Sequence, residues 1–204
     1  MYYIMTNKRR LGIFFFYDKN GVADPYVDYL LKDISQCFDK LIIVSNGPLS
    51  FEAIRIFNSY TSHIIVRENK GFDVWAYKTA IDNCGWKEIN SYFEIVLFNF
   101  TIMGPVYSFV EVFNDMDQVD VDFWGLNVHY GVDYDPTGVN PYGYLPKHLQ
   151  SHFIAFRNCL TSSEAFHKYW NNLPNIKSYE DAVGKHESYL TKHFEDLGFS
   201  WTSF

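Results

Sequence analysis

Four continuous apolar runs alternate with amphipathic segments along the first hundred residues of the chain. Each run predicts a buried strand. The runs cover residues 12–17, 41–44, 63–67 and 94–98. The segments between them carry apolar residues at helical spacing, as Tyr26, Leu30 and Ile34 do after the first run. The pattern therefore predicts strands and helices in alternation.

Residues that favour helix ends stand beside these amphipathic segments. Asp24 precedes Pro25, a pair that suits the N-cap and the first turn of a helix. Ser50 and Asp73 are expected to cap the second and third helices in the same way. Near the end of the chain, Gly198 follows an amphipathic segment and predicts a glycine-terminated helix.

Continuous apolar strands separated by amphipathic helices are typical of a parallel sheet covered on both faces. We therefore expect an α/β fold with a Rossmann-like, mostly parallel central sheet flanked by helices. Right-handed crossovers bring the carboxyl ends of such strands to one edge, where ligands bind. Polar residues follow each predicted strand and should meet at one cleft there. They are Asp18, Ser45, Asn46, Asn69, Lys70, Gly71, Asp73, Asn99 and Thr101.

The second half of the chain has a different pattern. We expect strands at residues 122–126 and 152–157 and helices at residues 163–170 and 185–197. Residues 129–147 are rich in Gly, Pro, Tyr and Asp, so they predict a long loop of the kind that often covers or binds ligands. No repeat or interdomain linker interrupts the sequence, which predicts one domain.

Composition narrows the classes of function. With 204 residues, 48% of them hydrophobic and 20% aromatic, the chain can bury a core, and some of its aromatic rings could line a sugar site. A net charge of -7 without a basic stripe argues against a nucleic-acid partner. Three separated cysteines fit a reducing cytosol rather than a disulfide framework or a zinc site. The apolar run near the start is too short for a membrane span.

Two of the polar clusters are candidate donor sites. Residues 68–73 enter a helix N-terminus, where free backbone N–H groups and Lys70 suit a diphosphate; an ordinary strand-to-helix turn explains the same residues. Enzymes that use nucleotide sugars often place two carboxylates after the fourth strand to hold Mg²⁺ or Mn²⁺. Here that position holds Asn99, Phe100 and Thr101, which argues against a tight all-protein metal site and leaves metal dependence open.

Further candidates lie in the second half. Glu187 begins the last predicted helix on the same face as the apolar Leu190, so it could project into the cleft and accept a proton, or simply favour the helix dipole. A serine and two histidines, Ser151, His148 and His152, precede residues 153–157 of the strand expected at 152–157, but no nucleophile-elbow motif supports serine catalysis there.

Seven segments, in this order, resemble the rhamnan synthesis F family of glycosyltransferases and cover nearly the whole chain. They are YDKNGVADPYVDYL, LIIVSNG, ENKGFDVWAYKTAI, VLFNFTIMGPVY, DFWGL, HLQSHFIAF and HESYLTKHFEDLGF. The resemblance implies a single GT-A-like domain over residues 1–204, with a nucleotide-sugar-binding half at 1–105 and an acceptor-facing half at 106–204. It also implies transfer of rhamnose or another deoxysugar from a nucleoside diphosphate donor to a growing bacterial surface polysaccharide.

The same resemblance assigns residues to roles. The donor loop would contain Asp18 and Asp24. The nucleotide would lie near Asn69, Gly71 and Asp73. In the family's N-D-S element Asn99 and Thr101 match the outer members, whereas Phe100 replaces the carboxylate. The matched segments also supply the expected acceptor-binding residues, which are Trp124, Gln150, Ser151 and His152.

Glu187 stands eleven residues before Gly198, the spacing at which inverting GT-A enzymes carry their catalytic base. The resemblance therefore makes Glu187 the expected base, although His186 replaces the first acid of the usual pair. It implies a cytoplasmic protein without a membrane span, acting on a glycan or lipid-linked glycan. Peripheral association with the inner face of the plasma membrane stays open.

Two other functions stay open from the sequence. Phe100 in the carboxylate position is compatible with a non-catalytic module that binds a nucleotide or a sugar. Another α/β enzyme, such as a nucleotidyltransferase or a methyltransferase, is a third alternative, although neither a G-x-G-x-x-G nor a Walker motif is present.

Overall fold

The computed structural model describes residues 8–204 of the chain. Within them, seven strands form one sheet in the order β3-β2-β1-β4-β8-β5-β9, and two short strands pair separately. The sheet contains β1 (Arg10–Phe16), β2 (Lys40–Asn46), β3 (Ile64–Arg67), β4 (Glu94–Asn99), β5 (Phe123–Gly125), β8 (Phe153–Arg157) and β9 (Trp201–Ser203). The separate pair is β6 (Val128–His129) and β7 (His148–Leu149).

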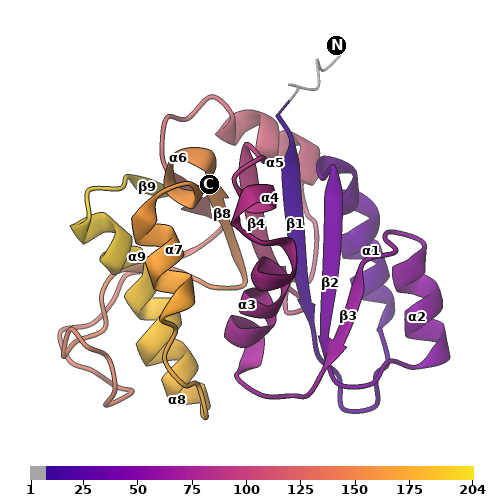
Figure 1. Ribbon diagram of the computed structural model, residues 1–204, viewed down its shortest axis with the longest axis horizontal. Coiled ribbons are helices and arrows are strands. Elements are labelled where there is room, and N and C mark those ends of the chain that lie inside the picture. The colour runs from indigo at the N-terminus through magenta and orange to yellow at the C-terminus, as the bar shows by residue number, and fades with distance from the viewer. Residues whose placement is uncertain (1–7) are drawn as a thin grey trace.

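Helices cover both faces of the sheet (Figure 1). They are α1 (Pro25–Ile34), α2 (Phe51–Asn58), α3 (Phe72–Cys84), α4 (Trp86–Ile89), α5 (Phe109–Met116), α6 (Asn158–Thr161), α7 (Glu164–Asn171), α8 (Tyr179–Ala182) and α9 (Ser188–Asp196). A 3₁₀ turn, η1 (Ser35–Cys37), follows α1, and a π-helical turn, η2 (Val183–Glu187), joins α8 to α9.

Two apolar layers hold the sheet between the helices. Alternate residues of β1 enter opposite layers because successive side chains of a strand point to opposite faces. Ile13 and Phe15 pack with residues of α3, α7 and α9, whereas Phe14 and Phe16 pack with residues of α1, α2 and α5. This arrangement explains why the strands read as continuous apolar runs in the sequence.

The predicted α/β fold with a mostly parallel sheet is confirmed. Strands β1 to β4 run parallel to one another, and β8 runs antiparallel to both β4 and β5. The carboxyl ends of β1 to β4 therefore lie along one edge, the lower edge in Figure 1, where α8 also lies. No helix within residues 8–204 is long and apolar enough to cross a membrane.

Three local predictions need correction. The third helix begins at Phe72 after Gly71, so Asp73 lies in its first turn and is not its cap. Asp24 precedes α1 as predicted, but its side chain makes no capping hydrogen bond, whereas the Ser50 hydroxyl does cap α2. The last predicted helix is two elements, because its first turn is the π-helical η2.

Four helices, α4, α5, α6 and α8, have no counterpart in the elements predicted above, and α5 is the longest of them. Its signal was present, because Ser108 caps it and its buried residues fall at helical spacing. These residues are Phe109, Val112, Phe113 and Met116. The helix packs in the same apolar layer as α1.

Candidate functional site

A cleft of about 420 Å³ opens at the carboxyl edge of β1 and β4, between the start of α3 and η2. The polar residues predicted to converge there come from both halves of the chain. Those that line the cleft are Asn69, Asp73, Asn99, Thr101, Gln150, Ser151, His152 and Glu187. The fold therefore brings expected donor-side and acceptor-side residues to one cavity.

Asn99 links the end of β4 to the start of α3. Its Oδ1 accepts hydrogen bonds from the backbone N–H of Thr101 at 3.0 Å and from the Thr101 hydroxyl at 2.6 Å. Its Nδ2 lies 3.4 Å from Oδ2 of Asp73, which its amide donates to. Asn99 is buried, so these bonds hold both neighbours in place at the cleft wall.

Asn46, at the end of β2, holds the turn before α3 through hydrogen bonds. The Asn46 amide donates to the carbonyl of Phe72 at 3.0 Å and to Oδ1 of Asn69 at 3.4 Å. The guanidinium of Arg67 donates to the side-chain oxygen Oδ1 of Asn46 at 2.6 Å. Asn46 is fully buried, so its role is to shape the turn and not to touch a ligand.

Backbone geometry at this turn requires glycine. Gly71 has φ of 74°, and the next residue, Phe72, also has a positive φ of 54°. A Cβ on Gly71 would lie 2.3 Å from the Trp75 ring, far inside van der Waals contact. Left-handed backbone at a bulky residue such as Phe72 is strained and concentrates at functional sites.

Asp73 lies against the cleft with its carboxyl group partly removed from water. Burial, together with the negative charge of nearby Glu187, raises the pKa of Asp73 to about 6. Its hydrogen bonds from Asn99 and from the N–H of Val74 act in the opposite direction but do not outweigh burial. Asp73 therefore changes charge close to neutral pH.

Glu187 stands on the opposite wall, at the end of η2. Its Oε2 accepts hydrogen bonds from the N–H of Ser151 at 3.0 Å and from the Ser151 hydroxyl, and its Oε1 lies 3.7 Å from Nε2 of His148. Burial alone would raise the pKa of Glu187, but the interaction with nearby His148 and the hydrogen bonds from Ser151 outweigh it and bring the pKa to about 2. Glu187 is therefore an anion in the resting protein.

Contacts of Ser188 and Gly184 accompany the π-helical turn that carries Glu187. The hydroxyl of Ser188 donates to the carbonyl of Val183 at 2.7 Å and accepts from the Asn140 amide at 2.9 Å. Gly184 faces the long loop so closely that a Cβ would lie 2.3 Å from Oγ1 of Thr137. The predicted loop at 129–147 thus packs against the segment that presents Glu187, and π-helical turns are frequent at functional sites.

Several predicted site residues do not line the cleft. Trp124 is completely buried, packs on Phe113 and Phe153, and donates its indole N–H to Glu94 at 2.8 Å, so its assignment to acceptor binding is wrong. Lys70 is exposed and pairs with Glu68. The others that do not line it are Asp18, Asp24, Ser45, Asn46 and Gly71.

Each of these residues has another local role. Ser45 is buried and donates to the carbonyl of Gly47. Asp18 accepts the N–H groups of Asn20 and Val22 and thereby closes the turn after β1. Asp24 is exposed at the start of α1. Turn formation, and not ligand contact, explains why polar residues follow these strands.

Two histidines at the cleft were not assigned roles from the sequence. His186 lines it, is buried, and has its pKa lowered to about 4 by burial, with Nδ1 2.8 Å from the Tyr169 hydroxyl. His148 is buried behind Glu187. In the sequence, only the closeness of His148 to Ser151 pointed to a site role. The contact of His148 with Glu187 could not be predicted, because it joins segments that are far apart in the chain.

The lining of the cleft shows whether it can hold a metal ion. Phe100 lies at its floor and packs edge-on against Phe15 and Phe16, with ring centroids 5.9 and 5.7 Å apart. Across residues 8–204, no group of three or more His, Cys, Asp or Glu side chains is placed to hold a metal ion. These residues do not make a metal-binding set of their own.

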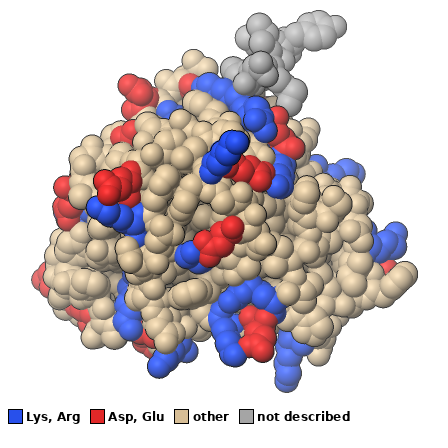
Figure 2. All heavy atoms as spheres, in the orientation of Figure 1, with Lys and Arg blue, Asp and Glu red and all other residues tan. Residues whose placement is uncertain are grey.

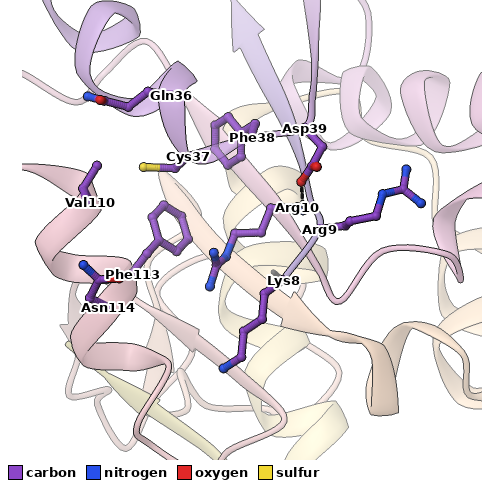
Figure 3. Close-up of a pocket in the computed structure, with 10 residues that line it drawn as sticks. All are labelled: Lys8, Arg9, Arg10, Gln36, Cys37, Phe38, Asp39, Val110, Phe113 and Asn114. Carbon is purple, nitrogen blue, oxygen red and sulfur yellow. Dashed lines mark hydrogen bonds between the residues drawn. The ribbon is translucent and has the colours of Figure 1, made fainter. Parts of the chain in front are cut away.

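A second cavity, of about 270 Å³, lies at the opposite edge of the sheet and contains three basic residues, Lys8, Arg9 and Arg10 (Figure 3). Arg10 is paired with Glu94 at 3.0 Å and with Asp117 at 2.5 Å, and Lys8 pairs with the same aspartate. These ion pairs neutralise much of the positive charge. On the face shown in Figure 2, acidic and basic side chains are likewise scattered and form no single patch.

The fold and the position of the cleft define the class of protein: a GT-A-like α/β domain whose candidate site lies at the carboxyl edge of the sheet. The chain belongs to the family described as rhamnan synthesis protein F, whose model matches residues 41–204. A curated relative, the uncharacterized protein y4gN of Sinorhizobium fredii, is 24% identical over 193 residues. That match covers 95% of this chain but only 48% of y4gN, so the chain spans about half the length of this relative.

Solved structures share the fold at low sequence identity. A putative nucleotide-diphospho-sugar transferase from Desulfovibrio desulfuricans aligns over 96% of this chain and 79% of its own, with a TM-score of 0.53 and 12% identity. The 4-diphosphocytidyl-2C-methyl-D-erythritol synthase from Anaerococcus prevotii aligns over 97% of this chain and 86% of its own, with a TM-score of 0.55 and 11% identity. At such identities the likeness establishes the fold alone.

Proposed function

We propose that the protein is an inverting glycosyltransferase that moves a sugar from a nucleoside diphosphate donor to a growing surface polysaccharide. The donor sugar is rhamnose or another deoxysugar, as the family description suggests. Glu187 acts as the base that deprotonates the acceptor hydroxyl, which then attacks the anomeric carbon. The reaction takes place in the cytoplasm, at the inner face of the membrane where a lipid-linked glycan is available.

One observation carries this proposal: a single cleft joins the braced turn before α3 to an ionised carboxylate on the opposite wall. The turn offers Asn69 and the Asn99–Thr101 pair as polar groups for a nucleoside diphosphate. Glu187 faces them across the cavity. A carboxylate within reach of a bound acceptor hydroxyl is what general base catalysis requires.

Donor binding is the first test. We expect calorimetric titration with a panel of nucleoside diphosphates, with and without Mg²⁺ or Mn²⁺, to give saturable binding. Asn99→Ala should weaken that binding about tenfold, because Thr101 and Asp73 lose the side chain that positions them. The exposed Asn58→Ala, at the end of α2, is the matched control. Absence of binding to every nucleotide at millimolar concentration would contradict the proposal.

The acceptor side of the cleft continues into a mostly apolar hollow. The hollow, of about 560 Å³, shares Thr101 and His152 with the cleft, and among residues 8–204 no Lys, Arg, Asp or Glu side chain lines it. Three of its large apolar residues are highly exposed: Met103 by 78%, Val106 by 91% and Tyr107 by 70%. An uncharged, apolar part of a lipid-linked acceptor fits this surface better than sugar hydroxyls, which would lack partners there.

Octyl glucoside, kept below its critical micelle concentration, and methyl glucoside, which forms no micelles, test this assignment. We expect octyl glucoside to bind more tightly than methyl glucoside and to shift the Met103 methyl resonance. The double variant Met103→Gln, Val106→Ser should weaken octyl glucoside binding about tenfold through lost apolar contact. Val119→Ser changes an exposed valine outside the hollow and should have no effect. Equal binding of the two glucosides would exclude an apolar acceptor subsite.

The competing functions predict different results. A non-catalytic module would bind the donor in the first titration but transfer no sugar to any acceptor. A nucleotidyltransferase would release pyrophosphate from a nucleoside triphosphate in place of a nucleoside diphosphate from a sugar donor. The fold alone does not separate these classes, because it is shared with a nucleotide-diphospho-sugar transferase and with a diphosphocytidyl-methylerythritol synthase.

A further inference from the structure

A second large cavity lies outside the cleft. Its volume is about 760 Å³, compared with about 420 Å³ for the cleft, and within residues 8–204 the two share no lining residue. Helices α7 and α9, which lie side by side on one flank of the sheet, supply most of its wall (Figure 1). Ligand pockets commonly have volumes of roughly 300–1,000 Å³, so the cavity can hold a small molecule.

Three rings on the wall of this cavity lie close to parallel. Tyr169 of α7 and Tyr189 of α9 have ring centroids 6.3 Å apart and an angle of 13° between their planes. Tyr189 and His193, one turn further along α9, have centroids 5.0 Å apart and planes at 22°. The cavity therefore has an aromatic wall to which both helices contribute.

Hydrogen bonds hold these rings in place. The Tyr189 hydroxyl lies 3.0 Å from Nδ1 of His193, and the Tyr169 hydroxyl lies 2.8 Å from Nδ1 of His186. Tyr169 is buried apart from the edge that meets the cavity. Side chains that are already ordered lose little conformational freedom when a ligand binds. The aromatic wall is thus a pre-formed binding surface.

The long loop at 129–147 forms another side of the cavity. Val139 and Pro141 line it. The residue between them, Asn140, is buried, and its amide donates to the Ser188 hydroxyl at the start of α9 at 2.9 Å. This hydrogen bond fixes the loop against α9 at the point where it meets the cavity.

The charged side chains of the lining are balanced by partners of opposite sign. Nζ of Lys168 lies 2.8 Å from Oε1 of Glu164, and Lys185 pairs with Asp181. Burial lowers the pKa of His193, so its ring is uncharged at neutral pH. A diphosphate or an anionic lipid headgroup binds best to unbalanced positive charge, which this lining does not offer. An uncharged ligand fits it better.

Polar groups at the rim are available to ligand hydroxyls. Asn172, just after α7, donates from Nδ2 to the carbonyl of Lys168 at 2.8 Å, whereas its Oδ1 accepts no hydrogen bond within residues 8–204. Lys168 and Glu164 are also largely exposed. An aromatic wall beside a polar rim matches a pyranose, which has a C–H face and several hydroxyls. A purely apolar partner would strip water from the rim and return no hydrogen bonds.

A single helical turn, η2, separates this cavity from the cleft. Lys185 lines the cavity, whereas the next two residues, His186 and Glu187, line the cleft. The hydrogen bond between Tyr169 and His186 crosses the same wall. A saccharide in the cavity would therefore lie behind the turn that carries the proposed base.

Resting on the proposed function for the identity of its ligand, we propose that this cavity is a second glycan site, which binds uncharged pyranose units of the polysaccharide away from the point of transfer. The aromatic wall packs on the C–H faces of the sugar rings, and the rim residues Asn172, Lys168 and Glu164 bond their hydroxyls. By holding units added earlier, the site keeps a long acceptor on the protein between transfers.

The binding test uses the whole chain and an α-linked rhamnose trisaccharide as the probe. We expect a Kd of about 1 mM and shifts of the Tyr189 and His193 ring resonances. Tyr189→Leu should weaken binding about tenfold, because a ring of the wall is lost. Asn172→Ala changes an exposed side chain, so the fold is kept, and should weaken binding about threefold. Tyr29→Leu changes an exposed tyrosine on α1 and should bind like the wild type.

A kinetic measurement separates ligand binding from a structural role. In Tyr189→Leu the KM for the trisaccharide as acceptor should rise about tenfold, while kcat and the KM for methyl rhamnoside stay at their wild-type values. Ring resonances that the trisaccharide leaves unchanged at high millimolar concentration would overturn the second site. Resonances that follow protein concentration and not sugar would also overturn it, with a second copy of the chain as the occupant.

Failure of the proposed function would give a different result. A protein that binds the trisaccharide through Tyr189 but transfers no sugar would refute the glycosyltransferase and keep the second site. A protein that transfers sugar, with the same KM for the trisaccharide in Tyr189→Leu, Asn172→Ala and the wild type, would refute the second site and keep the glycosyltransferase.

Discussion

Replacing Glu187 by glutamine is expected to reduce sugar transfer about 10³-fold in kcat while nucleoside diphosphate binding stays close to that of the wild type. Glutamine has nearly the same shape and can still accept hydrogen bonds from Ser151 through its carbonyl oxygen. It cannot take a proton from the acceptor. General acid–base groups typically contribute 10² to 10⁴ in rate, which sets the expected size of the effect.

Mass spectrometry of the acceptor after incubation with a matched donor measures the rate, and calorimetry measures donor affinity. The control is Glu180→Gln, which removes an exposed carboxylate from α8 without touching the cleft. If Glu187→Gln retained the wild-type kcat, Glu187 would not be the base, and Asp73 would become the remaining carboxylate of the cleft to examine. A simultaneous loss of donor binding would indicate a disturbed fold instead.

Replacing Asp73 by asparagine is expected to stabilise the folded protein at pH 7 to 8 but not at pH 4. The pKa of Asp73 is raised from 3.8 to about 6, so the folded protein holds this proton more tightly than the unfolded chain does. The contribution of Asp73 to stability is therefore most favourable below about pH 4 and is lost as the pH rises through about 6. Asparagine cannot ionise and escapes this loss.

A shift of this size corresponds to about 3 kcal/mol, which partial exposure of the side chain reduces to about 2 kcal/mol. Denaturant unfolding of Asp73→Asn and wild type at pH 4, 6 and 8 measures the difference. Comparing pH values cancels any constant cost of placing an amide beside Asn99. Asp82→Asn, at the exposed end of the same helix, is the control. If the difference in unfolding free energy between Asp73→Asn and the wild type did not change with pH, the raised pKa of Asp73 would be contradicted.

The raised pKa of Asp73 also affects donor binding. A diphosphate bound near this carboxyl group would add negative charge and favour its protonated form. Binding would then take up a proton around neutral pH, which calorimetry in buffers of different ionisation enthalpy detects. Glu187, held as an anion by Ser151 and His148, does not share this behaviour. The two carboxylates of the cleft are thus suited to different tasks.

Most of the layered fold could be read from the sequence because it depends on periodicity. Strands β1, β2 and β4 are buried on both faces, so each is a continuous apolar run in the sequence. Such a run can be recognised without knowing which elements pack against it. Helix α5 carries the same kind of local signal, because its buried residues fall at helical spacing. The antiparallel direction of β8 has no such signature, because it depends on the path of the chain between α5 and β8.

The candidate site, like the fold, could be predicted only in part from the sequence. Asn99, Asp73 and Glu187 could be placed at the cleft from strand ends, helix starts and the spacing to Gly198. Trp124 could not be judged, since an aromatic residue in a short apolar strand looks the same whether its ring meets a ligand or the core. Only the structure shows its indole bonded to a buried carboxylate, Glu94.

By itself the sequence determined that this chain forms alternating strands and helices and that polar residues follow the strands at one edge of a sheet. The tertiary structure decided which of those residues meet, and it brought His148 behind Glu187 although the two lie 39 positions apart by their numbers, 187 and 148. The physical reason is that periodicity is a local property of the chain. The pKa of a carboxylate is instead set by charges and hydrogen bonds from segments that meet only after folding.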